Sequence, residues 1–200
     1  MIRLIAHAAL LVATLTVPPA TPSAPTEPWD LALAPPGEPG RPFVLEGHVV
    51  ADSGAHALRD VRIHVYHADA RGDYVRPGER GNHLDGFLRT NVLGAYRIRT
   101  VLPGNAEGVP HIHLELETPR HACYAITLSL CRKQGAGSDT AYAQLPWMMT
   151  GTDVGAWGVV LPAGDGGYHC RWDLSLAQAA RIERPGAFAR PPRPAGDATR

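Results

Sequence analysis

The sequence has no excess of charge of either sign and few charged residues. Its 200 residues include 19 basic and 19 acidic side chains, so the formal net charge is zero. A balanced charge lacks the electrostatic pattern of a nucleic-acid-binding protein or of a polybasic protein that binds membrane surfaces. Because only 19% of the residues are charged, a long solvent-exposed coiled coil is also disfavoured. We therefore expect a globular domain with no nucleic-acid partner.

Long hydrophobic runs are missing from the sequence except at its beginning. Residues 4–17 are apolar apart from three polar positions, follow Arg3, and precede prolines and small residues. This is the arrangement of a secretory signal peptide, and about 14 residues are too few to span a membrane comfortably. We therefore expect residues 1–24 to be a signal peptide, cleaved near Ala20 or Ala24. The mature chain is expected to be secreted or periplasmic, without a membrane span.

Cysteine is scarce, with three residues: Cys123, Cys131 and Cys170. Residues 124–130 are predicted to form one strand, and the eight residue steps from Cys123 to Cys131 cover about 26 Å of extended chain. The Cα atoms of a disulfide lie about 5.5–6 Å apart, so Cys123 and Cys131 cannot pair across a continuous strand. If the strands of Cys131 and Cys170 are antiparallel neighbours, these two cysteines are predicted to pair, with Cys123 free. Three reduced thiols are the alternative.

Glycine and proline are abundant, with 21 and 19 residues. Such a content is typical of short strands joined by turns. Apolar and polar residues alternate in several short segments, and the predicted strands are 44–51, 61–66, 96–102, 111–117, 124–130, 158–161 and 168–176. With no strong helical period and no internal repeat, the pattern predicts an all-β fold with a single β-sandwich domain.

The ends of the chain differ in composition from this middle part. Residues 25–40 are rich in proline and predict a linker or an extended arm. The sandwich is expected to cover residues 41–177. Residues 178–200 are rich in arginine, proline and alanine and predict a disordered tail beyond a short helical start. Removal of residues from about 185 onward is expected to cost little stability.

The strongest chemical motif is the pair His111 and His113, which follows Pro110. Residues i and i+2 of a strand point to the same face, so the two imidazoles are expected to lie side by side. Such a pair is half of a nitrogen-ligand site for a metal ion. A surface or hydrogen-bonded structural role is expected for the other histidines of the strand and loop region, which are His48, His56, His64, His67, His83, His121 and His169.

Four motifs in combination resemble the intradiol ring-cleavage dioxygenases. They are the segments 45–54 with 60–74, 87–104, 110–113 and 167–174, which follow one another in the order and spacing of that family. The resemblance spans about residues 41–177. It implies a β-sandwich core that holds non-haem Fe(III) through two tyrosinates and two histidines. The enzymes of this family bind a catecholate, activate it toward O2 and split the bond between the two hydroxyl-bearing carbons.

The resemblance also implies a ligand set for this chain. Tyr74 matches the first tyrosine ligand of the family, and His111 and His113 match the histidine pair. A hard phenolate oxygen favours ferric over ferrous iron, and imidazoles complete such a site without excess charge. Tyr74, His111 and His113 are therefore the expected metal ligands and catalytic residues.

Two positions depart from the family pattern. The second tyrosine ligand is expected shortly after the turn at Pro103 and Gly104, but residues 105–109 contain none. Family members also commonly carry an arginine three residues before the first histidine, where this chain has Gly108. The candidates for a replacement ligand are Tyr124, Tyr142, Tyr168, Glu107 and a water molecule.

Three functions agree with these observations. The first is an exported oxidoreductase of the intradiol type with Fe(III), acting with O2 on a catechol or another phenolic substrate. The second is a metal-binding protein with a changed metal or reaction, because three ligands and an open position also suit Cu or Zn. The third is a non-catalytic sandwich that binds a ligand or a partner. A homo-oligomer is compatible with each of them.

Overall fold

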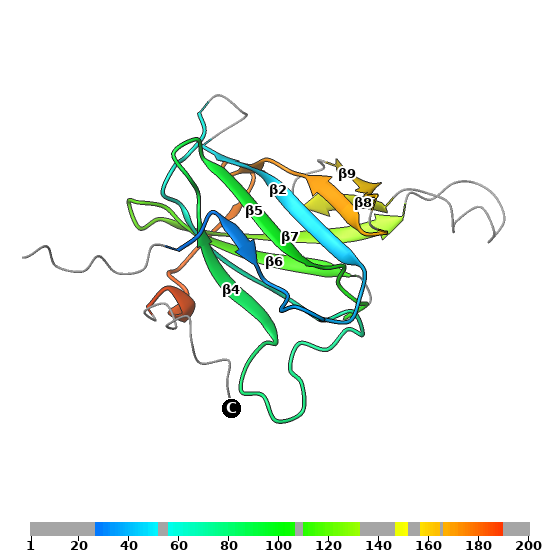
Figure 1. Cartoon of the computed structure of the whole chain (residues 1–200). Coiled ribbons are helices and arrows are strands. Elements are labelled where there is room, and N and C mark those ends of the chain that lie inside the picture. Colours follow the sequence, from blue (N-terminus) through cyan, green and yellow to red (C-terminus); the bar gives the residue numbers. More distant parts are fainter. Residues whose placement is uncertain are drawn as a thin grey trace, which may run out of the picture.

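The computed structural model describes residues 27–51, 56–106, 110–132, 147–151, 157–164 and 166–189. The expected signal peptide and the last residues of the chain lie outside these ranges. The described residues form strands and one short 3₁₀ helix, η1 (Figure 1). The elements are β1 Asp30–Ala32, β2 Pro42–Val50, β3 Arg62–His67, β4 Leu84–Arg89, β5 Ala95–Val101, β6 His111–Glu117, β7 Cys123–Arg132, β8 Trp147–Gly151, β9 Trp157–Pro162, β10 Tyr168–Arg171, β11 Leu174–Ser175, β12 Ala180–Ile182 and η1 Gly186–Ala189.

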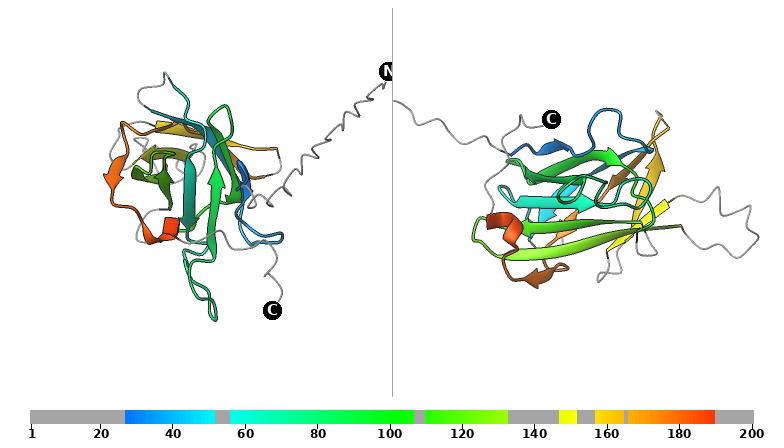
Figure 2. Two further views of the ribbon diagram at one scale, coloured as in Figure 1. Left: turned by 90° about the vertical axis from the view of Figure 1, so that its left-hand side faces the viewer. Right: turned by 90° about the horizontal axis from the view of Figure 1, so that it is seen from below.

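The strands pair in the order β1-β5-β2-β10-β9-β8-β7-β6-β3-β4, with β11 beside β2 and β12 beside β7. The sheet folds over on itself, so that β2 and β5 lie in one layer and β3, β6 and β7 in the other. In the right-hand view of Figure 2, the light green strands β6 and β7 lie at the bottom and the blue strand β1 at the top. The predicted all-β sandwich is thus confirmed.

Alternation along the strands builds the core between the two layers. In β6 the apolar residues Ile112 and Leu114 are 0% and 1% exposed, while His113 between them is half-buried. Ile98 of β5 is 0% exposed and belongs to the same hydrophobic cluster as Ile112. Because successive side chains of a strand point to opposite faces, the alternation leaves polar side chains on the outer face of β6. Among the described residues, no helix is long and apolar enough to cross a membrane.

Ordered structure extends beyond both boundaries predicted for the sandwich, residues 41–177. Within the expected linker, β1 pairs in parallel with β5, and Leu33 after it is 8% exposed. Within the expected disordered tail, β12 pairs with β7, and Phe188 of η1 is 4% exposed. A few apolar side chains in segments rich in proline, alanine and arginine are therefore enough to dock both ends on the sandwich.

The predicted disulfide between Cys131 and Cys170 is also wrong. Cys170 is a free, buried thiol, as is Cys123. The prediction required neighbouring strands, but β8 and β9 lie between the strands of these two residues in the sheet order. Strands are about 4.8 Å apart, so the two backbones lie well beyond the reach of a disulfide. The continuous strand β7 does keep Cys123 and Cys131 apart, as expected.

Candidate metal centre

The candidate site lies where the irregular segment 68–83 meets the beginning of β6. This segment connects β3 to β4 and carries Tyr74 near its middle. His111 is the first residue of β6, and the register places His113 beside Tyr66 of β3 and Thr127 of β7. The two histidines therefore share the outer face of this layer, as the i and i+2 spacing predicted.

The three residues expected to be metal ligands come together in space. The hydroxyl oxygen of Tyr74 lies 2.7 Å from Nε2 of His111 and 3.1 Å from Nε2 of His113. His111 is 8% exposed, and the other two side chains are half-buried. One oxygen and two nitrogens thus converge on one point, although Tyr74 is 37 and 39 residues away from the two histidines.

This donor set fits a transition metal. Ligand bonds of about 2.0–2.2 Å place neighbouring donor atoms of one coordination sphere roughly 3 Å apart. The two distances from the Tyr74 oxygen are close to that value, so an ion requires only small movements of the donors. Among the described residues, no three histidine, cysteine, aspartate or glutamate side chains form a metal-binding group. The centre therefore depends on the tyrosine oxygen.

Neighbouring side chains fix the orientation of His113. Its ring stacks on Tyr66, with the centroids 4.7 Å apart and the planes inclined by 20°. Its Nδ1 lies 3.3 Å from Oγ1 of Thr127. Burial raises the pKa of Tyr66, and the charges of Glu115 and Asp85 raise it further. Tyr66 is therefore a neutral aromatic wall of the site.

A second polar cluster on the same face surrounds His64. Its Nδ1 lies 2.9 Å from Glu115 and its Nε2 lies 3.1 Å from Asp85. Burial alone lowers the pKa of His64, but the hydrogen bonds and charges of the two carboxylates outweigh burial and raise the pKa above 6.5. Because ionised carboxylates only accept, the protonated, positively charged ring satisfies both of these contacts at once.

The turn at Pro103 and Gly104 packs beneath the segment that carries Tyr74. The amide of Gly104 donates to the carbonyl of Asp69 over 2.8 Å. A Cβ atom on Gly104 would lie 2.4 Å from the nitrogen of Gly72, so a larger residue would force the two segments apart. The motif therefore needs glycine here because two backbones meet.

Two of the residues that could replace the second tyrosine of the family pattern, Tyr124 and Tyr168, have other surroundings in the structure. Tyr124 is on the face of β7 opposite to Thr127, and like Tyr168 it packs against the core. The Tyr168 hydroxyl instead accepts a hydrogen bond from Arg41 over 2.6 Å. Tyr142 and Glu107 lie outside the described residues. Of the tyrosines that the structure describes, Tyr66 shares the site with Tyr74.

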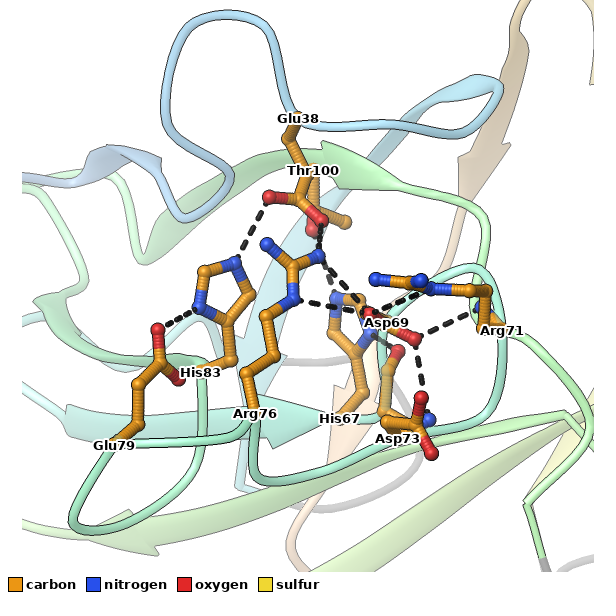
Figure 3. Close-up of polar contacts among 10 residues, drawn as sticks. Glu38, His67, Asp69, Arg71, Asp73, Arg76, Glu79, His83 and Thr100 are labelled. Carbon is orange, nitrogen blue, oxygen red and sulfur yellow. Dashed lines mark hydrogen bonds and ion pairs between the residues drawn. The ribbon is translucent and has the colours of Figure 1, made fainter.

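Sequence reasoning missed an ion-pair network of four residues around the Tyr74 segment, although it assigns His83 a surface or hydrogen-bonded structural role. They are Glu38, Asp69, Arg76 and His83, which form the ion-pair network in Figure 3. No local sequence pattern predicts this network, since Glu38 is 38 residues from Arg76 and 45 from His83. The predicted structural role of the other histidines holds for His67, which is fully buried and hydrogen-bonded to Ala68 and Thr100.

Comparisons with known proteins point to one class. No family model matches the chain. Over 93 residues the chain is 38% identical to the protocatechuate 3,4-dioxygenase alpha chain of Pseudomonas putida. The match covers 42% of this chain and 46% of that protein, so it spans less than half of the relative's length.

Solved structures of similar fold cover more of the chain. One is the dioxygenase domain of a dioxygenase–carbohydrate-binding fusion protein from Streptomyces sp. SirexAA-E, with a TM-score of 0.55, 23% identity and coverage of 82% of this chain and 95% of that one. Another is an intradiol ring-cleavage dioxygenase from Tetranychus urticae, with a TM-score of 0.53, 13% identity and coverage of 82% and 93%. These likenesses show the fold.

The fold is therefore that of the intradiol ring-cleavage dioxygenases. The chain is related in sequence to one of them, the alpha chain of protocatechuate 3,4-dioxygenase. The resemblance found in the sequence motifs is confirmed.

Proposed function

We propose that the protein is an exported non-haem iron oxidoreductase of the intradiol type. It acts with O2 on a catechol or another phenolic substrate, with Tyr74, His111 and His113 as ligands of Fe(III). The observation that carries the proposal is the convergence of the Tyr74 oxygen on Nε2 of both histidines, at 2.7 and 3.1 Å. A sandwich that only binds a partner has no need to bring these donors together from a loop and a strand.

Each residue of the set has a distinct task in this proposal. Tyr74 supplies a phenolate, a hard anionic donor that favours the ferric state. His111 and His113 supply neutral nitrogen donors and leave room for a bidentate substrate, because the second tyrosine of the family pattern is missing. When bound, the ferric ion would hold the catecholate and activate its ring toward O2. Both oxygen atoms of O2 then enter the diacid product, and no further reductant is required.

The surroundings of the site support an aromatic substrate. Tyr66 presents a half-buried ring beside His113, and Phe87 lies beyond it, stacked on His64 at 4.6 Å. Planar rings favour such neighbours through stacking and apolar contact. The negative charge of a bound catecholate would face the imidazolium of His64 across Tyr66, although the family's arginine is absent.

The test of this proposal is the colour of the protein after loading with iron. A tyrosinate bound to Fe(III) produces a visible charge-transfer band, because an easily oxidised oxygen is bonded to an oxidising metal. Tyr74→Phe should abolish the band and leave a folded protein, since the change removes one hydroxyl and keeps the ring. His111→Ala and His113→Ala should reduce the iron content, because each removes a ligand.

Tyr168→Phe is the matched control for the tyrosine variant. It removes a hydroxyl that is hydrogen-bonded to Arg41, on the other side of the sandwich, and should leave the band unchanged. A protein that binds no iron, or whose colour survives Tyr74→Phe, would exclude the ligand set. Bound Cu or Zn in place of iron would favour a changed metal. O2 uptake with catechols then tests the reaction.

We also propose that the mature protein is exported. The support is the apolar run of residues 4–17 after Arg3, followed by small residues. Expression with residues 1–24 should yield a processed chain in the cell envelope or the medium. An unprocessed chain that stays inside the cell, with its N-terminus shown by Edman sequencing, would refute export.

A further inference from the structure

The position of Tyr74 depends on a segment without regular structure. Residues 68–83 connect β3 and β4, and Figure 1 shows this teal-green loop extending away from the sandwich. A free loop of this length loses backbone conformational entropy at every residue when it is ordered. A tyrosine oxygen held about 3 Å from two imidazoles therefore requires an anchor for the whole segment.

The first part of the anchor is the carboxylate of Asp69, which is 1% exposed. It accepts hydrogen bonds from the amides of Arg71 and Asp73, at 2.8 and 3.1 Å. It also accepts from Nε and Nη2 of Arg76, at 3.1 and 2.9 Å. The turn immediately before Tyr74 is thus closed by Asp69 and tied to Arg76 after Tyr74.

The second part of the anchor comes from outside the segment. Glu38 lies between β1 and β2, and its side chain is 3% exposed. Its carboxylate binds Nη2 of Arg76 and, over 2.9 Å, Nε2 of His83 (Figure 3). The amide of His83 donates to the carbonyl of Tyr74 over 2.7 Å. Glu38 therefore joins the two residues that flank Tyr74 on its C-terminal side.

Each charged group of this network is paired with a group of opposite charge. Two buried carboxylates, Glu38 and Asp69, share one guanidinium, and His83 adds a second positive partner between Glu38 and Glu79. Hydrogen bonds from His83 and Arg76 outweigh the effect of burial and keep the pKa of Glu38 below 4.5. Removal of one partner leaves a buried charge without compensation, so the segment must rearrange.

We propose that Glu38 and Arg76 are positioning residues for Tyr74. They hold its hydroxyl at the two imidazoles by bracing the segment 69–83 against the N-terminal arm, residues 27–41. This inference rests on the proposed function in one respect: it assigns the bracing to a metal ligand. The bracing itself is a property of the protein without metal and is measured separately.

The experiment compares Glu38→Ala with Glu27→Ala. Glu27 is a matched control, because it is also a carboxylate of the N-terminal arm, is 8% exposed, and binds two arginines, Arg62 and Arg89. Its partners lie at the beginning of β3 and the end of β4, at the other end of these strands from the site. Both changes are expected to lower stability, so a loss of stability does not distinguish them.

Two readouts do distinguish the variants. In the metal-free protein, Glu38→Ala should speed amide hydrogen exchange in residues 69–83, above all at His83, while Glu27→Ala should leave that segment protected. In the iron-loaded protein, Glu38→Ala should weaken the charge-transfer band and lower iron affinity about 10- to 100-fold, the usual effect of losing a residue that orients a ligand. Glu38→Gln keeps an acceptor oxygen and should restore part of both.

Each outcome has one meaning. If Glu38→Ala retains wild-type exchange, band and affinity while Tyr74→Phe loses the band, the inference is overturned and the proposed function stands. If the wild-type protein binds no iron, the proposed function fails, and amide exchange alone decides whether Glu38 braces the segment. If Glu38→Ala does not fold, Glu38→Gln and Arg76→Lys replace it, because both keep the side-chain volume. Unchanged exchange and iron affinity in both would equally overturn the inference.

Discussion

His67 should make the protein less stable in mild acid. Its ring is fully buried, Nδ1 donates to the carbonyl of Ala68 over 2.7 Å, and Nε2 lies 2.8 Å from Oγ1 of Thr100. Burial lowers the pKa of His67 from 6.5 to about 4, and the hydrogen bond to Ala68 opposes this only in part. The folded protein therefore keeps His67 neutral at a pH where the unfolded chain already binds a proton.

The magnitude follows from this difference in pKa. Because the folded pKa is the lower one, the contribution of His67 to the free energy of unfolding is complete above pH 6.5 and is lost as the pH falls toward 4. One pKa unit corresponds to about 1.36 kcal/mol, so the full loss is about 3.4 kcal/mol. Between pH 7.5 and pH 5, the same two pKa values give a loss of about 2 kcal/mol.

Other titrating groups act in different ranges or in the opposite sense. The pKa values of Glu38 and Asp69 are lowered from 4.5 and 3.8, so their contributions are lost only in stronger acid. The pKa values of His64 and His83 are raised above 6.5, so their contributions are complete below pH 6.5 and are lost as the pH rises. These groups are present in both the wild type and a His67 variant, so the difference in stability between the two proteins removes their effects.

The assay is urea unfolding of the wild type and of His67→Gln at pH 7.5 and at pH 5. Glutamine retains a donor and an acceptor but does not titrate, so the variant should be less stable at pH 7.5. The stability difference between the two proteins should shrink by about 2 kcal/mol at pH 5. His56→Gln, a change at an exposed histidine, should show no such shift. A difference for His67→Gln that is equal at both pH values would refute the argument.

Three further changes test the packing. Phe188→Ala should lower the free energy of unfolding by about 3 kcal/mol, as buried phenylalanines commonly do, because its 4% exposed ring packs on Phe87 and Arg62. A truncation after Arg184 should cost at least as much, and a fully stable truncated chain would show that η1 is not docked. Gly47→Ala should cost about 3 kcal/mol, since its Cβ would lie 1.9 Å from the carbonyl oxygen of Trp172. Gly164→Ala, where no atom lies within 4 Å, is the control and should be neutral in the same denaturation assay.

The strands of the core could be predicted because each carries its own signal. In β3 the residues Ile63 and Val65 face the core at 0% exposure, between polar residues that face outward. Alternation of this kind is visible within the six residues of the strand and does not depend on other parts of the sequence. Strand β4 was missed because Gly86 interrupts its pattern. The small residue suits a distant contact, since a Cβ there would lie 3.0 Å from the side chain of Leu33 in the N-terminal arm.

The site could be predicted in part for the same reason. His111 and His113 are neighbours on one strand, so their common face follows from the spacing alone. The partnership of Tyr74 came from the family resemblance, and the structure brings its oxygen within 2.7 Å of His111. The disulfide failed because it required the order of the strands, and β8 and β9 separate the two cysteines. Local patterns indicate strands but do not determine which strands become neighbours.

The ion-pair network behind Tyr74 was beyond prediction for a further reason. Carboxylate, guanidinium and imidazole side chains are mostly exposed in proteins, so the sequence alone predicts that each of them is a solvated surface group. The Glu38 side chain is 3% exposed because the half-buried Arg76 and His83 neutralise it, so its burial depends on the presence of both partners. This dependence also explains why the network suits the positioning of a ligand. Hydrophobic contacts adapt to small shifts, whereas buried ion pairs with fixed hydrogen-bond geometry resist them, and a metal ligand must keep its place when the metal is absent.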